Sequence, residues 1–405
     1  MENQDINTLV AGNNRFALDV YSKLWKAEGN VVFSPHNMST ACAIAYAGTR
    51  ATTEEQIART MHFNLGQARI HSAFASLETR LRTERGNRPS LHMANAMWFQ
   101  GGYMPSEEFS ALVANNYGAK ISANIREIND WIAKNTAGMI RNLIGNLNPQ
   151  FPLVIVGAIY FLCQWEKQFA RKNTRNGLFH VDASASTKVP MMAQRKRFRY
   201  AESDDLQILE LPYAGFQQSM LIILPREIDG LVGLSDLLSL ENLQKWQDRL
   251  EERDVVVIIP KLRAECRYEL SSVLSSLGMV DAFSPDTADF SAISCQRPGL
   301  YIAQVVHEAI VRLDEAGTEA SASTVIKMGF TGRMPHDEPV VFCADHPFVF
   351  FITDRPTGTI LFMGKISNPS HRTAYSRINC SRTPSPPRRW PPRSWTGPLQ
   401  RTSRP

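Results

Sequence analysis

The sequence lacks the motifs by which most enzymes are recognised. It has no G-x-S-x-G nucleophile elbow, no G-x-G-x-x-G or phosphate-binding loop, and no C-x-x-C pair. His307-Glu308 begins like a zinc-protease motif, but Val311 stands where the second histidine is required. The six cysteines are scattered, without the spacing of a zinc or redox site. We therefore predict that the protein is not an enzyme and that it holds neither a metal ion nor a cofactor.

The sequence also lacks a membrane-spanning run and a secretory leader. No stretch reaches the roughly 18 apolar residues that a membrane helix needs, so no membrane partner is predicted. Residues 1–14 have neither a basic start nor a long apolar run. We expect a cytoplasmic protein or one exported without a signal peptide, and an extracellular location stays open. Free thiols in a reducing compartment are the favoured state of the cysteines.

Positive charge is scarce in the body of the chain and concentrated in its tail. Residues 370–405 contain eight arginines and no lysine, aspartate or glutamate, and removing these charges from the net +5 leaves −3. The same segment holds seven prolines and few aliphatic residues. We therefore predict one domain over residues 1–369 and a disordered Arg/Pro-rich tail over residues 370–405. The body shows no clustered basic residues, so no nucleic-acid partner is predicted.

Helical patterns fill the first third of the chain, and strand patterns follow. Phe16, Val20 and Leu24 recur at helical spacing, Thr53-Glu54-Glu55-Gln56 fits a capping box, and residues 126–144 repeat the helical pattern. Short apolar runs predict strands at Leu153–Val156, Met220–Leu224, Val255–Ile259, Phe348–Ile352 and Ile360–Met363. Helices first and strands later, without regular alternation, predict an α+β fold.

The most informative pattern lies between residues 315 and 339. Every second residue from Thr318 to Met328 is small or apolar, and most of the residues between them are polar. This alternation predicts a strand with one buried face, and no proline interrupts it. Residues 330–339 lack periodicity and predict a loop. A flexible Ala/Ser/Thr linker or a weak helix is the alternative for such a segment in isolation, but its position between two buried strands favours a strand that can move.

This segment and its surroundings resemble the serpins, a family of serine-protease inhibitors. Residues 315–320, Glu-Ala-Gly-Thr-Glu-Ala, followed by small residues and Thr324, are similar to the serpin hinge, and residues 342–348 resemble the family signature after the reactive loop. The resemblance covers residues 14–369. Its other matches, in order, are Phe33-Ser34-Pro35, Ala96-Met97-Trp98, Ala158-Ile159-Tyr160-Phe161 with Trp165, Val189-Pro190-Met191-Met192, Glu210-Leu211-Pro212-Tyr213, Ile259-Pro260-Lys261, Leu277-Gly278-Met279, Asp289-Phe290-Ser291 and Gly364-Lys365-Ile366-Ser367-Asn368-Pro369.

The resemblance implies a serpin fold and a suicide mechanism without a cofactor. In this fold a helix-rich N-terminal part packs on a large mixed sheet and smaller sheets, and a reactive-centre loop is exposed. A serine protease, or alternatively a cysteine protease, would cleave the loop and be trapped as a covalent complex while the hinge inserts as a new strand of the main sheet. A monomer is expected. The hinge residues would be Glu315, Gly317, Thr318, Glu319, Ala320, Ala322 and Thr324. A small Thr318 favours inhibition, since a charge there would be costly to bury.

The reactive-site bond follows from the family's usual interval after Glu315, which leads to Thr331-Gly332. Arg333-Met334 is the alternative and would suit a trypsin-like protease, whereas cleavage after Phe330 would suit a chymotrypsin-like one. Two other functions stay open. One is a non-inhibitory serpin that acts as a binding or chaperone protein, and the other is a defective serpin variant, because the chain is shorter than the family pattern between Lys120 and Glu127.

By the same resemblance Ser34, Asn37 and His307 belong to the shutter beneath the sheet that opens, and Trp165 belongs to the breach. Asn37 stands where the family usually has a small hydroxyl residue, and Gly157 stands where it usually has Asn. We hypothesise that Asn37 supplies the hydrogen bond to His307 that Gly157 cannot. A satisfied core histidine is the alternative for His307.

One basic segment could suggest glycosaminoglycan binding, as in some serpins. It contains Arg80, Arg82, Arg85 and Arg88, but Glu78 and Glu84 dilute it. A solvated helix face is therefore favoured, and no glycosaminoglycan partner is predicted.

Overall fold

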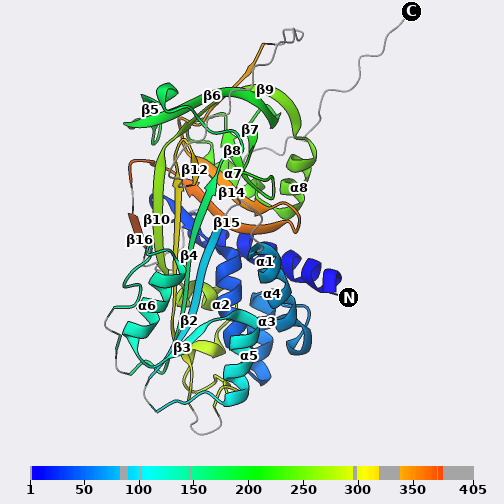
Figure 1. Ribbon diagram of the computed structural model, residues 1–405, viewed down its shortest axis with the longest axis vertical. Helices are drawn as coiled ribbons and strands as arrows, with labels where there is room; N and C mark the ends of the chain where they lie inside the picture. Colours follow the sequence, from blue (N-terminus) through cyan, green and yellow to red (C-terminus); the bar gives the residue numbers. More distant parts are fainter. Residues whose placement is uncertain are drawn as a thin grey trace, which may run out of the picture.

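Two β-sheets and a set of helices build the fold (Figure 1). The computed structural model describes residues 2–82, 90–100, 102–145, 147–148, 150–294, 299–318, 338–371 and 373–376. Its helices are α1 (Glu2–Leu24), α2 (Pro35–Ala47), α3 (Ala51–Thr60), α4 (Gln67–Arg82), α5 (Glu107–Tyr117), α6 (Ile125–Asn135), α7 (Leu231–Leu237), α8 (Leu240–Asp248) and α9 (Ser271–Ser276), with short 3-10 turns η1 (Arg171–Asn173) and η2 (Asp281–Phe283).

The strands within these ranges form a nine-stranded and a seven-stranded sheet. The nine-stranded sheet runs in the order β1 (Val31–Phe33), β15 (Thr359–Ile366), β14 (Phe348–Asp354), β8 (Gln218–Pro225), β7 (Leu206–Pro212), β6 (Ser186–Glu202), β9 (Glu251–Pro260) and β13 (Val340–Cys343), and β5 (Arg175–His180) also pairs with β6. The seven-stranded sheet runs in the order β16 (Thr373–Ser376), β10 (Leu262–Glu269), β11 (Ile302–Leu313), β4 (Leu153–Gln164), β2 (Ser90–Phe99) and β3 (Lys120–Ser122), and β12 (Gly317–Thr318) also pairs with β4. The predicted α+β class is confirmed, and each of the five predicted apolar runs lies in a strand.

Helix α2 lies at the centre of the fold, and most of its residues are apolar or small, although His36 and Asn37 are polar. All 13 of its residues are buried, which is the pattern of a helix enclosed by other elements. It contacts β4 and β2 of the seven-stranded sheet and β15 of the nine-stranded sheet. The hydroxyl of Ser34 caps its start by accepting a hydrogen bond from the Asn37 N–H at 3.1 Å, and Pro35 occupies the first turn.

Helix α6 covers the opposite face of the seven-stranded sheet from α2 (Figure 1). Ile128 and Ile132 bury its apolar side against strand residues such as Val154 and Val156. The helix begins at Ile125, where the side chain of Asn124 caps it. The segment that is shorter than the family pattern therefore still contains an edge strand, β3, and a capped helix start.

The edge of the seven-stranded sheet lies beyond the predicted end of the domain. Strand β16, residues 373–376, pairs in parallel with residues 265–268 of β10. The prediction that residues 370–405 form a disordered tail is therefore wrong for these four residues. An unpaired edge of β10 offers backbone groups that another strand can satisfy, and composition alone does not reveal such a pairing.

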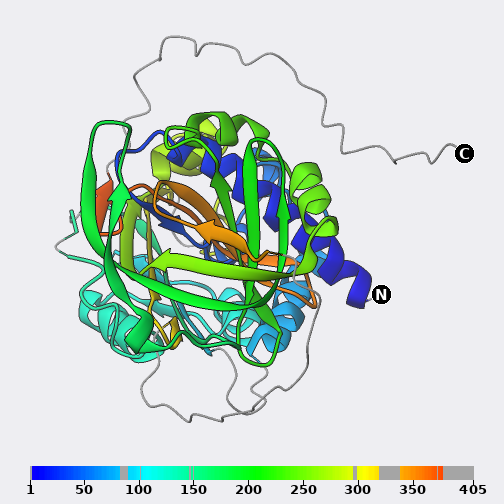
Figure 2. The ribbon, with the colours of Figure 1, turned by 90° about the horizontal axis from the view of Figure 1, so that it is seen from above.

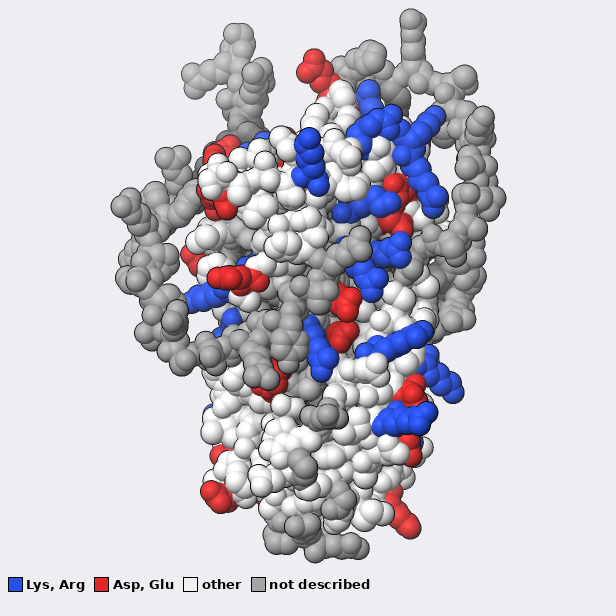
Figure 3. Space-filling model, turned by 90° about the vertical axis from the view of Figure 1, so that its left-hand side faces the viewer, with Lys and Arg blue, Asp and Glu red and all other residues white. Residues whose placement is uncertain are grey.

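Strands β6 and β9 arch side by side across one end of the molecule (Figure 2), where an alternating row of charges joins them. Arg195 pairs with Asp254 at 2.7 Å and Arg197 with Glu252 at 3.6 Å. Figure 3 shows Lys and Arg along one border of the adjoining face with acidic side chains among them. Cross-strand pairs of opposite charge favour this pairing of the two strands.

None of the helices in the described part of the chain combines the length and the apolar character needed to cross a membrane.

Candidate functional site: the hinge and the seam

The seven-stranded sheet contains a seam where two long strands lie in parallel. β11 pairs with β4 in parallel, with His307 beside Gly157, whereas β4 is antiparallel to β2 and β11 is antiparallel to β10. A strand inserted antiparallel between β4 and β11 would replace one parallel pairing by two antiparallel ones. Antiparallel pairs are slightly more stable per residue than parallel pairs, so the seam is a place where an additional strand fits.

The predicted hinge leaves β11 at the end of this seam. Gly317 and Thr318 form β12, which pairs antiparallel with Gln164 and Cys163 of β4. Gly317 has a φ of +150°, and a Cβ atom there would collide with the backbone oxygen of Cys163. Only glycine therefore fits at this point of close approach. The hinge begins on β4 with the antiparallel direction that an inserted strand requires.

Glu315 fastens the base of the hinge to the body of the protein. Its buried carboxylate accepts hydrogen bonds from Lys261 Nζ at 2.7 Å and Thr174 Oγ1 at 2.8 Å, and its carbonyl oxygen accepts one from the Phe169 N–H at 2.8 Å. Burial opposes ionisation of this group, but the bonds from Lys261 and Thr174 outweigh burial and lower the pKa of Glu315. Neither Lys261 nor Thr174 could be predicted as a partner of Glu315, because both lie far from it along the chain.

Trp165, which the sequence analysis assigned to the breach, directly follows β4 at the point where β12 pairs with that strand. Its indole Nε1 donates to the carbonyl oxygen of Asp314 at 3.0 Å, and its backbone N–H donates to the carbonyl oxygen of Ala316 at 2.8 Å. Its ring stacks on Tyr213 with centroids 4.6 Å apart and planes 7° from parallel. Trp165 therefore holds the residues on both sides of Glu315.

Ser34 and His307, two of the predicted shutter residues, are in direct contact. The Ser34 N–H donates to His307 Nε2 at 3.0 Å. Because Nε2 is an acceptor here, the neutral ring carries its proton on Nδ1. Burial lowers the pKa of His307 to about 3, although the backbone of Gly157 favours the protonated form. Within the described residues Nδ1 has no hydrogen bond of normal geometry.

Asn37 is close to this contact, but the hypothesis that its side chain bonds to His307 is wrong. Asn37 Nδ2 donates instead to Asn95 Oδ1 on β2 at 2.9 Å. Its Oδ1 rests against Gly157, where a Cβ atom would lie 2.6 Å from it, and that oxygen has no hydrogen-bond partner in the described structure. The physical reason is register: Asn95 and His307 flank Gly157 on opposite sides in the sheet, and the amide of Asn37 points to the first of them.

The remaining predicted loop residues lie outside the described residues. These are Glu319, Ala320, Ala322 and Thr324 of the hinge and Thr331, Gly332, Arg333 and Met334 at the two predicted bonds. The chain returns in β13, where Val340–Cys343 pairs in parallel with β9. Among the side chains that the structure does describe, no group of three or more His, Cys, Asp or Glu is arranged to hold a metal ion.

Comparison with known proteins identifies this arrangement. The family model for serpins, described as serine protease inhibitors, matches residues 11–369. The chain belongs to the serpin family. It is 40% identical to an uncharacterised serpin-like protein of Thermococcus kodakarensis over 88% of this chain and 84% of that protein. It is 36% identical to human leukocyte elastase inhibitor over 89% of this chain and 99% of that protein.

The serpin fold is confirmed by solved structures as well. Human thyroxine-binding globulin superposes with a TM-score of 0.83 at 26% identity, over 91% of this chain and all of that chain. Within this serpin, Glu315 directly follows β11, the strand that carries His307 and forms the parallel seam with β4.

Proposed function

We propose that this serpin inhibits a serine protease by trapping it after cleavage of the reactive loop. The observation that carries the proposal is the antiparallel pairing of β12 with β4 at the end of the parallel β4–β11 seam. Cleavage beyond the hinge would free the following residues to continue β12 between the two strands, as strand addition into a sheet. The sequence identity of 36% to human leukocyte elastase inhibitor, over 89% of this chain, supports a protease as the partner.

The proposed sequence of events starts with the protease attacking the loop as a substrate. The acyl-enzyme would form at Thr331-Gly332, with Arg333-Met334 as the alternative bond, and the serpin would act as a monomer. Residues 318–328 would then enter the seam, with their small or apolar set on one face. Small side chains at the start of this set would meet little steric resistance between two strands. Pulling the acyl-enzyme along with the hinge would distort the protease before it can hydrolyse the ester.

The test is a covalent trap assay with proteases of different specificity. We expect the serpin mixed with elastase, chymotrypsin or trypsin to give an SDS-resistant band with the combined mass of both proteins less that of the released C-terminal fragment. Mass spectrometry of the released C-terminal fragment identifies the bond: the fragment begins at Gly332, Met334 or Thr331 after cleavage at Thr331, Arg333 or Phe330. Papain tests the cysteine-protease alternative. Loop cleavage without a covalent band for any of these enzymes would contradict the proposal and indicate a non-inhibitory or defective serpin.

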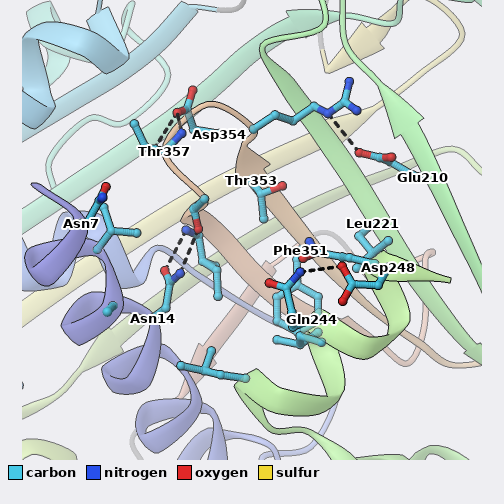
Figure 4. Close-up of a pocket in the computed structure, with 18 of the residues that line it drawn as sticks. Asn7, Asn14, Glu210, Leu221, Gln244, Asp248, Phe351, Thr353, Asp354 and Thr357 are labelled. Atoms are coloured by element: carbon cyan, nitrogen blue, oxygen red, sulfur yellow. Dashed lines mark hydrogen bonds and ion pairs between the residues drawn. The ribbon is translucent and has the colours of Figure 1, made fainter. Parts of the chain in front are cut away.

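A cavity supports a second candidate function, binding of a small amphipathic molecule. It has a volume of about 640 Å³ and lies among α1, α8 and strands β8, β14 and β15 (Figure 4). Part of the cavity is lined by apolar side chains, which include Val10, Leu221, Leu243, Phe351 and Ile360. The rest is lined by polar side chains, which include Asn7, Asn14, Gln244, Asp248 and Thr353, and by Glu210 with its ion pairs to Arg199 and Arg355. The structurally similar human thyroxine-binding globulin binds thyroxine, as its name says. Calorimetric titration with thyroxine tests this function, and Leu221→Arg should abolish any heat of binding.

A further inference from the structure

A second cavity, which the proposed inhibition does not use, lies among α2, α3, α4 and α5. It has a volume of about 800 Å³ and is bounded by the end of α2, the starts of the other three helices and residues 291–292. Helices α3 and α5 lie toward the end of the molecule remote from the arch of β6 and β9 (Figure 1). The volume is within the range of roughly 300–1,000 Å³ that is usual for small-molecule sites.

One wall of this cavity is held by hydrogen bonds and is uncharged at neutral pH. His71 on α4 is 7% exposed, and its Nε2 donates to Gln67 Oε1 at 2.9 Å, since that oxygen can only accept. Its Nδ1 therefore accepts from the Tyr117 hydroxyl at 2.6 Å. Burial lowers the pKa of His71 to about 4. Gln67 Nε2 donates in turn to the carbonyl oxygen of Tyr46 at 2.7 Å, so the wall is preformed and neutral.

The charge of the cavity comes from three other lining side chains, which form no ion pair with any residue that the structure describes. Arg50 and Glu108 are exposed, and Glu54 is half-buried. The Arg50 guanidinium donates to the carbonyl oxygen of Thr49 at 2.6 Å, which leaves further N–H groups for a ligand. Glu54 accepts a hydrogen bond from the Tyr46 hydroxyl at 3.4 Å. One cation and two carboxylates thus line a single cavity without neutralising one another by contact.

Apolar side chains complete the lining. Phe109 on α5 is 3% exposed, and Leu112, one turn further along the helix, is half-buried. Ala47, Ala68 and Ala292 also line the cavity and leave its volume open because they are small. A ligand that covers this apolar surface removes it from water, which favours binding.

We propose that this cavity binds a small zwitterion with an apolar side chain, such as a free dipeptide. The carboxylate of the ligand would pair with Arg50, whose planar fork of donors matches a carboxylate. Its ammonium group would pair with Glu54 and Glu108, and its apolar side chain would cover Phe109 and Leu112. A ligand of one charge would leave the opposite charge of the lining without a partner, which is why both charges are assigned to the ligand.

This binding site is independent of protease inhibition. None of its described lining residues belongs to β4, β11 or β12, the strands that form the seam and the start of the hinge. The proposal therefore stands or fails separately from insertion of the hinge.

Isothermal titration calorimetry of the full chain with the dipeptide Phe-Leu tests the proposal. We expect saturable binding to wild type. Two modified probes should each bind about tenfold more weakly, because each lacks one charge-assisted contact: N-acetyl-Phe-Leu has no ammonium group, and Phe-Leu amide has no carboxylate. Gly-Gly keeps both charges but has no apolar side chain, and it should also bind more weakly than Phe-Leu.

Substitutions assign each charge of the ligand to its partner. Arg50→Gln should bind Phe-Leu about tenfold more weakly than wild type does, yet bind Phe-Leu amide as wild type does, because the lost contact is the one to the carboxylate. Glu54→Gln/Glu108→Gln should show the converse, with a loss for Phe-Leu and none for N-acetyl-Phe-Leu. Glu55→Gln is the matched control, since Glu55 is exposed on α3 and is not among the lining residues.

Three results would overturn the proposal. The first is the lack of saturable binding of Phe-Leu to wild type at millimolar concentration. The second is binding of either modified probe as tight as that of Phe-Leu, which would show that one of the two charges has no partner in the cavity. The third is wild-type affinity for Phe-Leu in both Arg50→Gln and Glu54→Gln/Glu108→Gln, which would place the binding elsewhere. An unchanged melting temperature without ligand verifies that the variants are folded.

Discussion

Glu308 is a buried carboxyl group on one strand of the seam. It lies beside Arg267 on β10 and Ala158 on β4 and is 7% exposed. Burial and the neighbouring charge of Glu265 raise the pKa of Glu308 to about 7, whereas Arg267 lowers it. The group therefore changes its ionisation in the neutral range, at the seam where the proposed insertion would separate β11 from β4.

This shift predicts a pH dependence of stability with a definite sign. The pKa of Glu308 in the folded state, about 7, lies above the value of 4.5 for an unperturbed glutamate. The folded state therefore binds the extra proton, and the stabilisation is complete below pH 4.5 and is lost as the pH rises to 7. The loss is roughly 3 kcal/mol at most for a shift of this size. Glu308→Gln should remove this part of the pH dependence.

The measurement is the urea midpoint of wild type and Glu308→Gln between pH 4.5 and 8. The difference between the two proteins should grow in favour of the variant as the pH rises. Glu55→Gln, an exposed position on α3, is the control and should follow wild type. Parallel curves for wild type and Glu308→Gln would mean that Glu308 is not the group that titrates.

At the scale of elements, the hinge makes the sharpest prediction. Thr318 is the last described residue of β12 and the first member of the small or apolar set. In Thr318→Arg, a charge would have to enter the sheet without a partner, at a cost of several kcal/mol. Insertion would become slower than hydrolysis of the acyl-enzyme, so the protease would be released.

The measurement is the ratio of trapped complex to cleaved serpin on SDS gels. We expect this ratio to fall at least tenfold in Thr318→Arg, while the rate of loop cleavage stays near that of wild type because the substituted residue is remote from either predicted bond. Thr318→Ser keeps a small side chain and serves as the control. Efficient trapping by Thr318→Arg would exclude insertion of the hinge as the mechanism.

Strand β16 gives a second prediction at this scale. Truncation after Ser376 keeps the strand and should leave the melting temperature unchanged. Truncation after Pro369 removes four residues that pair with β10. The loss of their backbone hydrogen bonds should cost about 1–3 kcal/mol, and the exposed edge of β10 should promote self-association. Thermal melting and size-exclusion chromatography measure both effects, and identical behaviour of the two truncations would contradict the pairing.

Elements that depend on local sequence were predictable, and those that depend on distant partners were not. Apolar runs bounded by turn residues identified five strands, because four of the runs are buried on both faces and the fifth, Val255–Ile259, is fully buried on one face and half-buried on the other. The helix predicted for residues 126–144 ends at Asn135, because Ala137 and Gly138 adopt positive φ angles of 51° and 74°. The capping box at Thr53 is absent: α3 begins at Ala51, and Thr53 Oγ1 accepts from the Asp289 N–H.

The same division applies to the candidate site. The resemblance assigned Ser34 and His307 to one region, the shutter, and these two residues are in direct contact, whereas the assignment of Trp165 to the breach stays a prediction. It could not identify the partner of Asn37, because Asn95 reaches it only through the register of β2 on β4. Lys261 was part of a recognised motif, yet its ion pair with Glu315 spans 54 residues of sequence and depends on how the hinge leaves β11.

At the scale of the whole molecule, the proposed insertion of the hinge implies a native state that is not the most stable one. β4 and β11 pair directly, although a chain segment able to lie between them is attached at the end of β11. Under this proposal, such a state would persist because of a kinetic barrier that cleavage removes. Glu315, with its bonds to Lys261 and Thr174, holds the near end in the closed form.

Cleavage of the loop between Met328 and Arg333 should therefore stabilise the protein instead of loosening it. An inserted strand of about ten residues adds on the order of ten net-favourable hydrogen bonds, which for a domain of this size corresponds to a rise in melting temperature on the order of 10–20 °C. Limited proteolysis by trypsin or chymotrypsin, followed by calorimetry of the cut protein with its fragments still associated, measures the change. Cleaved Thr318→Arg serves as the comparison, because the same cut in a chain whose hinge cannot enter the sheet should raise the melting temperature far less. An equal rise in both proteins would assign the gain to release of the loop and not to a new strand in the seam.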